Sequence, residues 1–160
     1  MSSTSSSDGE DADATVATKT FLHGRLEFYI DRADGLPDTD KFPLALRFAD
    51  AFGTEKDVID PFVVGEMGDV SLFETFYLNN TLNPVWDQRF SVPINQEADN
   101  IKILLKDKDS LCSQFIASVN FSCHELVQEQ RMGGWYELKK DGENRGKIKM
   151  SIEFLDDSPF

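Results

Sequence analysis

The sequence is poor in the residues that most catalytic and zinc sites need. It contains only two histidines and two cysteines among 160 residues. So few of these residues support neither a Ser-His-Asp triad nor a Cys-His pair, and they form no cluster that would suit zinc. A glycine-rich phosphate-binding loop is also missing. These absences predict that the chain has no catalytic site and is not an enzyme.

Positive charge is also scarce, because 16 Lys and Arg residues face 29 Asp and Glu residues, for a net charge of -13. General nucleic-acid binding needs a basic face, so that class is not expected. An anionic membrane would repel the chain unless its acidic groups were neutralised locally. Two cysteines, Cys112 and Cys123, make no disulfide framework, and neither a signal segment nor a long apolar run is present. These features favour a cytoplasmic location.

The composition changes near residue 20. Residues 1–20 are rich in Ser, Asp, Ala and Thr and contain little to bury, so we expect a disordered acidic tail there. Residues 21–157 contain the apolar segments and are expected to form one domain. Thirteen phenylalanines suit a β-rich core.

Eight segments of this domain alternate apolar with polar residues or are rich in strand-forming residues, which is typical of β-strands. Gly68 and Asp69 separate two of them by a hairpin turn, and Pro93 suggests that its strand lies at a sheet edge. Residues 95–100 are expected to form a polar loop. The pattern predicts an all-β fold, an eight-stranded antiparallel β-sandwich. The expected strands lie at residues 23–30, 61–67, 71–78, 86–94, 101–105, 114–121, 135–138 and 147–155.

Two short helices are expected between strands. Ser122 and Glu125 have the spacing of a capping box, so a helix should run through Gln130 and end before Gly133-Gly134. The second helix is an insertion within residues 41–59, where apolar residues recur at three- and four-residue steps before Gly53.

Aspartates gather at three strand ends. Asp38 and Asp40 follow the first strand, Asp60 precedes the second, and Asp107 and Asp109 end the strand at residues 101–105. Alternate connections of a sandwich lie at the same end, so these aspartates could meet and form an oxygen cage suited to calcium. The pattern alone leaves open the simpler alternative that the acidic residues are only solvated.

Four short sequence runs resemble those of a C2 domain and follow the same order along the chain. A C2 domain is the calcium-dependent phospholipid-binding β-sandwich, and the resemblance covers roughly residues 21–157. More specifically, the chain resembles the amino-terminal domain of plant-type phospholipase D. That resemblance rests on the opening His23-Gly24-Arg25-Leu26, on the insertion at residues 41–59 and on the segment 113–117 after the acidic pair. The four runs are LPDTD at 36–40, DPFV at 60–63, NPVWDQRF at 83–90 and KDKD at 106–109.

The resemblance implies a set of calcium ligands. Gln114 stands near the position where many C2 domains have a last acidic ligand, and an amide oxygen brings no charge, so weaker binding or fewer ions are expected. Phe42 and Leu111 in the flanking loops are expected to contact the membrane. The implied ligands are the carboxylates of Asp40, Asp60, Asp107 and Asp109, with the backbone carbonyls of Thr39 and Lys108.

The function implied is calcium-dependent binding to anionic phospholipid, by a monomer that attaches peripherally to membranes when calcium binds. The chain would be the regulatory targeting domain of a phospholipase D-like protein, with a catalytic domain in the same polypeptide, or a small stand-alone C2 protein. It lacks the paired His-x-Lys motifs of phospholipase D catalysis. The strand at 71–78 has Glu74 and no basic residue, so no strong phosphoinositide site is expected there. The alternative function is a calcium-independent sandwich that binds a protein partner.

Overall fold

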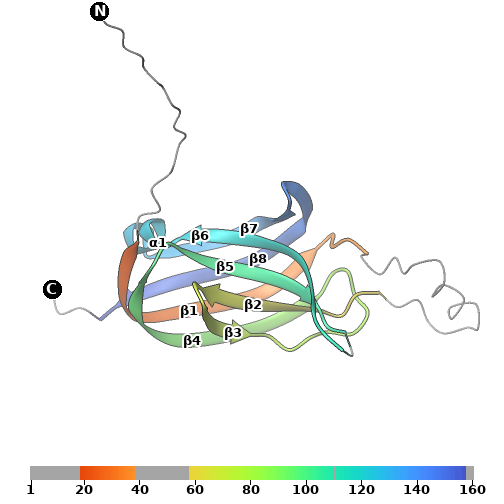
Figure 1. Ribbon diagram of the computed structural model, residues 1–160, viewed down its shortest axis with the longest axis horizontal. Coiled ribbons are helices and arrows are strands. Elements are labelled where there is room, and N and C mark those ends of the chain that lie inside the picture. The colour runs from red at the N-terminus through yellow and green to blue at the C-terminus, as the bar shows by residue number, and fades with distance from the viewer. Residues whose placement is uncertain (1–18, 39–57, 110, 158–160) are drawn as a thin grey trace, which may run out of the picture.

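Antiparallel strands and a short helix build the part of the chain that the computed structural model describes, residues 19–38, 58–109 and 111–157 (Figure 1). The eight strands confirm the predicted all-β class. The insertion predicted for residues 41–59 lies outside the described residues except for its last two. The strands are β1 (Thr20–Asp34), β2 (Pro61–Met67), β3 (Val70–Glu74), β4 (Val85–Ala98), β5 (Asn100–Asp107), β6 (Gln114–Ser122), β7 (Arg131–Lys140) and β8 (Glu143–Asp156), and the helix is α1 (Cys123–Glu129).

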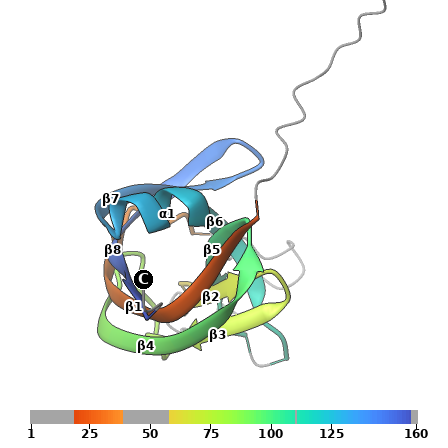
Figure 2. The same ribbon diagram turned by 90° about the vertical axis from the view of Figure 1, so that its left-hand side faces the viewer.

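The strands follow the hydrogen-bonded order β3-β2-β5-β6-β7-β8-β1-β4. Ser118 of β6 pairs with Lys139 of β7, and no further register pair joins these two strands in the described chain. The sheet therefore folds into two layers, β3-β2-β5-β6 and β7-β8-β1-β4, which curve around a common interior (Figure 2). The outer strands of the two layers also meet, because the rings of Phe73 and Phe90 stack with centroids 4.7 Å apart. The result is the predicted β-sandwich, nearly closed on itself.

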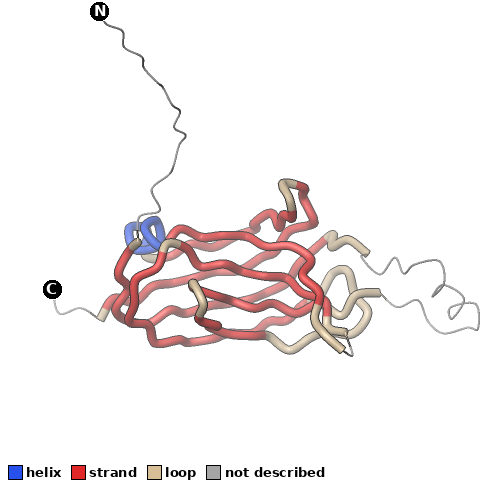
Figure 3. The backbone as a smooth tube through the Cα atoms, in the orientation of Figure 1, coloured by secondary structure: helices blue, strands red, loops and turns tan. Residues whose placement is uncertain are grey.

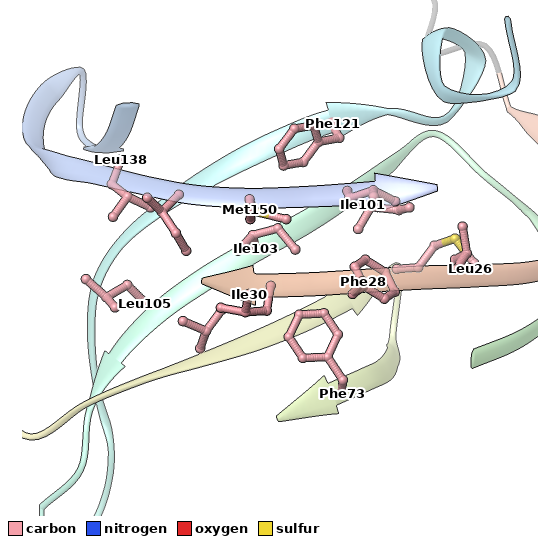
Figure 4. Close-up of a cluster of buried hydrophobic side chains, with 14 of the residues drawn as sticks. Leu26, Phe28, Ile30, Phe73, Ile101, Ile103, Leu105, Phe121, Leu138 and Met150 are labelled. Carbon is pink, nitrogen blue, oxygen red and sulfur yellow. The ribbon is translucent and has the colours of Figure 1, made fainter. Parts of the chain in front are cut away.

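The interior is filled by side chains from every second position of the strands. Ile101, Ile103 and Leu105 of β5 are fully buried, whereas Lys102 between them is exposed. Successive side chains of a strand point to opposite faces, so this alternation follows directly from the sequence. Phe28 and Met150 face them from the other layer (Figure 4). The same alternation carries the next odd position, Asp107, to the inner side at the end of β5.

The helix begins as predicted and ends earlier than predicted. The Ser122 hydroxyl accepts a hydrogen bond from the Glu125 N–H at 3.2 Å, which caps the first turn. Gln130 then adopts the left-handed conformation with φ 65° and closes the helix through its N–H to the Leu126 carbonyl. Gly133 and Gly134, which were expected to end it, lie inside β7. This helix is too short to cross a membrane, and the described residues contain no other helix.

Several strands also run beyond their predicted bounds, and the boundaries of β4 and β3 differ in ways that bear on the site (Figure 3). Residues 95–98, expected in a loop, continue β4 and pair with residues 20–23 of β1. The expected strand at 71–78 stops at Glu74. Beyond Glu74 the chain keeps contact with β2 through single bonds, since Thr75 and Leu78 donate their N–H groups to the carbonyls of Val63 and Pro61. β4 ends the strand order, as Pro93 suggested.

Candidate metal centre

Three chain connections meet at one end of the sandwich, opposite α1 (Figure 1). They are the described parts of the β1–β2 connection, the β3–β4 connection at residues 75–84, and the β5–β6 connection at residues 108–113. Strand directions dictate this meeting, because β1, β3 and β5 all finish at that end. Of the predicted acidic positions, the described ones, Asp38, Asp60, Asp107 and Asp109, are therefore brought to one end of the molecule.

Asp60 and Asp107 are adjacent although they lie 47 residues apart in the sequence. The ladder between β2 and β5 pairs Pro61 with Asp107. The Asp60 N–H donates to Asp107 Oδ1 at 2.8 Å, and the Lys108 N–H donates to the Asp60 carbonyl at 2.9 Å. These two bonds fix the start of β2 against the end of β5.

The β3–β4 connection holds the Asp60 side chain from another direction. The Asn80 N–H donates to Asp60 Oδ1 at 2.8 Å, and the Thr81 N–H donates to the Ile59 carbonyl at 3.1 Å. Asn80 has φ 50°, a left-handed conformation that asparagine tolerates better than most residues. The carboxylate of Asp60 is thus oriented by backbone groups rather than by long, mobile side chains.

Burial and neighbouring charges disfavour the charged form of the Asp107 carboxylate. It is 5% exposed, and burial raises its pKa above the ordinary aspartate value. Repulsion from Asp60, Asp109 and Asp38 raises the pKa further, while the hydrogen bond from the Asp60 N–H lowers it. The single hydrogen bond from the Asp60 N–H therefore only partly stabilises the negative charge of Asp107. A divalent cation would relieve such a site.

A hollow of about 480 Å³ opens beside these residues. Asp60 and Asp109 line it together with polar groups from two connections, Asn79 and Ser113. The Lys108 ammonium lies 5.8 Å from the centroid of the Tyr77 ring at the same hollow. Carboxylate, amide and hydroxyl oxygens are the hard donors that calcium takes, and the described residues of the hollow offer only one thiol, Cys112, and no imidazole, so its lining suits calcium better than zinc.

The structure places some of the predicted ligands and leaves others undescribed. Gln114 is exposed and pairs with Asp107 across the β5–β6 ladder. Leu111 is 94% exposed at the tip of the β5–β6 connection. Within the described residues, no three carboxylate, imidazole or thiol groups are close enough to hold a metal ion together. Three predicted site residues lie outside the described residues, namely Thr39, Asp40 and Phe42.

Sequence reasoning missed three residues near this end. Asp38 was noted as acidic but given no role, yet its charge acts on Asp107. Phe76 and Tyr77 are exposed aromatics on the β3–β4 connection. They were assigned to a strand that ends two residues earlier, and this boundary error concealed them. The Asn-rich turn at residues 79–83 begins after both aromatics and so gave no signal of the earlier strand end.

Residues 24–138 match the family model described as "C2 domain". Phospholipase D gamma 3 of Arabidopsis thaliana is 28% identical over 153 residues, which cover 84% of this chain and 17% of that protein. Phospholipase D beta 1 of the same plant is 31% identical over 127 residues, which cover 73% of this chain and 12% of that protein. The chain thus spans less than a fifth of the length of either relative.

Among solved structures, the calcium-bound pair of C2 domains from Extended-Synaptotagmin 2 superposes with a TM-score of 0.66. The sequence identity is 21%, and the match covers 84% of this chain and 46% of that one. At this identity the likeness is one of fold.

Proposed function

This chain belongs to the C2 domain family, and from that membership we propose that it is a calcium-dependent module for binding anionic membranes. The metal centre lies at the end of the sandwich that carries Asp60, Asp107 and Asp109. The observation that carries the proposal is Asp107, a buried carboxylate whose pKa is raised by burial and by three neighbouring aspartates.

Each proposed ligand has a defined part. Asp107 and Asp60 supply oxygens from positions fixed by the β2–β5 ladder. Asp109 and Asp40 add carboxylates from two connections, and the carbonyls of Thr39 and Lys108 add neutral oxygens. Bound calcium would neutralise these carboxylates and accept lipid phosphate oxygens as further ligands. Gln114 contributes an uncharged amide oxygen, so we expect a lower affinity than an acidic residue would give.

Membrane contact is assigned to apolar side chains at the same end. Leu111 is almost fully exposed, and Phe76 and Tyr77 are exposed nearby on the β3–β4 connection. Fully burying one leucine side chain in an apolar environment stabilises by about 1.5–3 kcal/mol. Phe42 is proposed to join this contact. Insertion of these side chains into the membrane would strengthen the membrane binding that bound calcium initiates.

The module is proposed to be non-catalytic and monomeric, in a cytoplasmic protein that attaches peripherally to membranes. The relatives in Arabidopsis thaliana are phospholipases D of which this chain matches a small part. A regulatory targeting domain of a phospholipase D-like protein is therefore one proposed context, and a stand-alone C2 protein is the other.

Vesicle cosedimentation tests the proposal. The purified chain is mixed with vesicles of phosphatidylcholine, with or without phosphatidylserine, in calcium or in EGTA. We expect sedimentation only when phosphatidylserine and calcium are both present. Asp107→Asn combined with Asp109→Asn should abolish it. Asp69→Asn, which removes one charge at the exposed β2–β3 turn, should not.

Equal binding in calcium and in EGTA would contradict the proposal. Absence of binding in every mixture would do the same, and it would favour the alternative of a calcium-independent module that binds a protein.

A further inference from the structure

The outer face of the β7-β8-β1-β4 layer carries aromatic and cationic side chains in neighbouring rows. One row runs from Trp135 through Lys149 to Arg32, and the next from Gly133 through Ser151 and Tyr29 to Arg89. Residues directly opposite one another in antiparallel strands project from the same face of the sheet. The register therefore places these side chains side by side on the outside of the sandwich.

A hollow of about 430 Å³ lies in the middle of this face. Gly133, Gly134 and Ser151 line it, and two glycines and a serine leave more space there than bulkier residues would. Tyr29, Arg131 and Lys149 stand at its sides. Gly133 pairs with Ser151 in the outer-face row, and a Cβ added at Gly133 would come within 3.1 Å of the Ser151 Cβ. The hollow thus lies where β7 has two glycines beside the small Ser151 of β8.

Two aromatic rings of this face, Tyr29 at the hollow and Trp135 in the neighbouring row, each lie close to a cation. The Arg89 guanidinium lies 4.1 Å from the centroid of the Tyr29 ring, and the Lys147 ammonium lies 4.7 Å from that of Trp135. Trp135 is 43% exposed, unlike the other tryptophan, Trp86, at 2%. Trp, Tyr and Arg are the residues that most often dominate the binding energy of protein interfaces. This face therefore has the composition of an interface centre.

The hollow has an excess of positive charge in a chain whose net charge is -13. Arg131 and Lys149 supply the cations, and Asp31 is the acidic residue in the lining. Asp31 is only 7% exposed. Its carboxylate accepts a bond from Arg32 Nε at 3.0 Å and lies 3.8 Å from Lys149 Nζ. Burial and these two cations therefore shield the negative charge of Asp31 from solvent, whereas the side chains of Arg131 and Lys149 remain exposed.

The charges that line an adjoining hollow help to decide which class of partner fits this face. It shares Tyr29 and Arg131 with the first, but Glu27 and Glu153 also line it. A uniformly anionic lipid surface would meet these two carboxylates as well as the cations. A peptide can instead place acidic side chains at Arg131 and Lys149 and uncharged or basic side chains at the glutamates. Both hollows lie on a sheet face rather than on the connections that form the candidate metal centre.

We propose that this face docks an acidic, extended segment of a partner protein. Carboxylates of the segment pair with Arg131 and Lys149, and its apolar parts lie against the rings of Tyr29 and Trp135. Because the face is separate from the candidate metal centre, docking is independent of the proposed membrane binding, and a partner could be held while the loops contact lipid.

The test uses a fluorescently labelled synthetic peptide that alternates glutamate with serine, and a matched peptide with glutamine in place of glutamate. Fluorescence anisotropy measures binding to the whole chain in EGTA. We expect the glutamate peptide to bind and the glutamine peptide not to bind. Arg131→Glu with Lys149→Glu should weaken binding by about tenfold or more, the scale of a lost charge pair across an interface. Lys19→Glu with Lys102→Glu makes the same charge change at exposed positions away from this face and should weaken binding far less.

Acrylamide quenching of tryptophan fluorescence gives a second readout that needs no variant. Only Trp135 is accessible to the quencher, because Trp86 is buried, so bound glutamate peptide should shield it. No binding of the glutamate peptide would overturn the proposal. Equal weakening by the two double variants, or binding that leaves Trp135 fully quenchable, would do the same. A loss of calcium-dependent vesicle binding in Arg131→Glu with Lys149→Glu would assign the face to lipid instead, and would also overturn it.

Discussion

Replacing Asp107 with asparagine removes one negative charge and keeps the hydrogen bond that organises the candidate metal centre. Asn Oδ1 can accept the Asp60 N–H as the aspartate oxygen does, at 2.8 Å. The substitution turns the other carboxylate oxygen into an NH2 group and removes the negative charge of a residue that is 5% exposed and repelled by Asp60, Asp109 and Asp38. Asp107→Asn therefore separates the electrostatic role of the residue from its structural role.

Without calcium, we expect the variant to be more stable than the wild-type protein at neutral pH. Burial, and then the neighbouring aspartates, hold the folded-state pKa of Asp107 above its unfolded value. The folded chain thus binds more protons between these two pKa values, and stability falls as pH rises through that interval. The penalty is complete at neutral pH and absent at pH values below the unfolded pKa. A higher free energy of unfolding, and with it a higher Tm, is therefore expected for the variant in EGTA at neutral pH.

With calcium, the order of stability should reverse. A ligand at a hundred times its Kd stabilises the folded state by about 2.7 kcal/mol, which corresponds to about 5–11 °C for a domain of this size. Loss of one carboxylate should weaken the site strongly, because calcium affinity follows ligand charge. If the Kd rises about a hundredfold, the variant gains only about 0.4 kcal/mol at the same calcium concentration.

Differential scanning calorimetry of both proteins in EGTA and in calcium measures all four states. Asp69→Asn serves as the control for a general loss of negative charge, since Asp69 lies at the exposed β2–β3 turn. An Asp107→Asn protein that was less stable in EGTA and still showed the full calcium-dependent rise in Tm would refute this reasoning.

Three further predictions follow from the same geometry. Leu111→Ser should weaken calcium-dependent vesicle binding by about tenfold, the equivalent of about 1.4 kcal/mol, and leave the calorimetric calcium affinity unchanged. Lowering the pH should reduce calcium binding measured by calorimetry, and the loss should begin above the pH range in which ordinary carboxylates titrate. Protons compete with calcium at Asp107, whose pKa is raised by burial and by its neighbours. Excess calcium should restore binding, and a pH-independent affinity would count against the role of Asp107. Ser122→Ala should cost about 1 kcal/mol of stability by removing the helix cap, seen as a lower Tm with calcium binding intact.

Local patterns were enough to predict most of the fold. Ile101, Ile103 and Leu105, with Lys102 and Lys106 on the opposite side, located β5 even though apolar Leu104 interrupts the alternation. Gly68-Asp69 located the turn between β2 and β3. Ser122 marked the helix start through a bond to a residue three positions away. Each of these features depends on neighbours in the sequence, so the sequence contains the needed information within a short window.

Features that depend on distant contacts were harder to predict. The bond from the Asp60 N–H to Asp107 joins residues 47 positions apart, and its existence depends on the register of β2 against β5. No local pattern reports that register. Gly133 and Gly134 were read as a helix stop because glycine is common in such positions, yet cross-strand pairing with β8 keeps them in a strand. The sequence could suggest that acidic residues meet, and only the ladder shows which of them are adjacent.

Isothermal titration of the purified chain with calcium, in the absence of lipid, tests the central claim most directly. We predict saturable binding that persists in Asp69→Asn and disappears in Asp107→Asn combined with Asp109→Asn. A titration with no binding heat and no calcium-dependent change in Tm would contradict the claim, and so would binding that survives the double substitution unchanged.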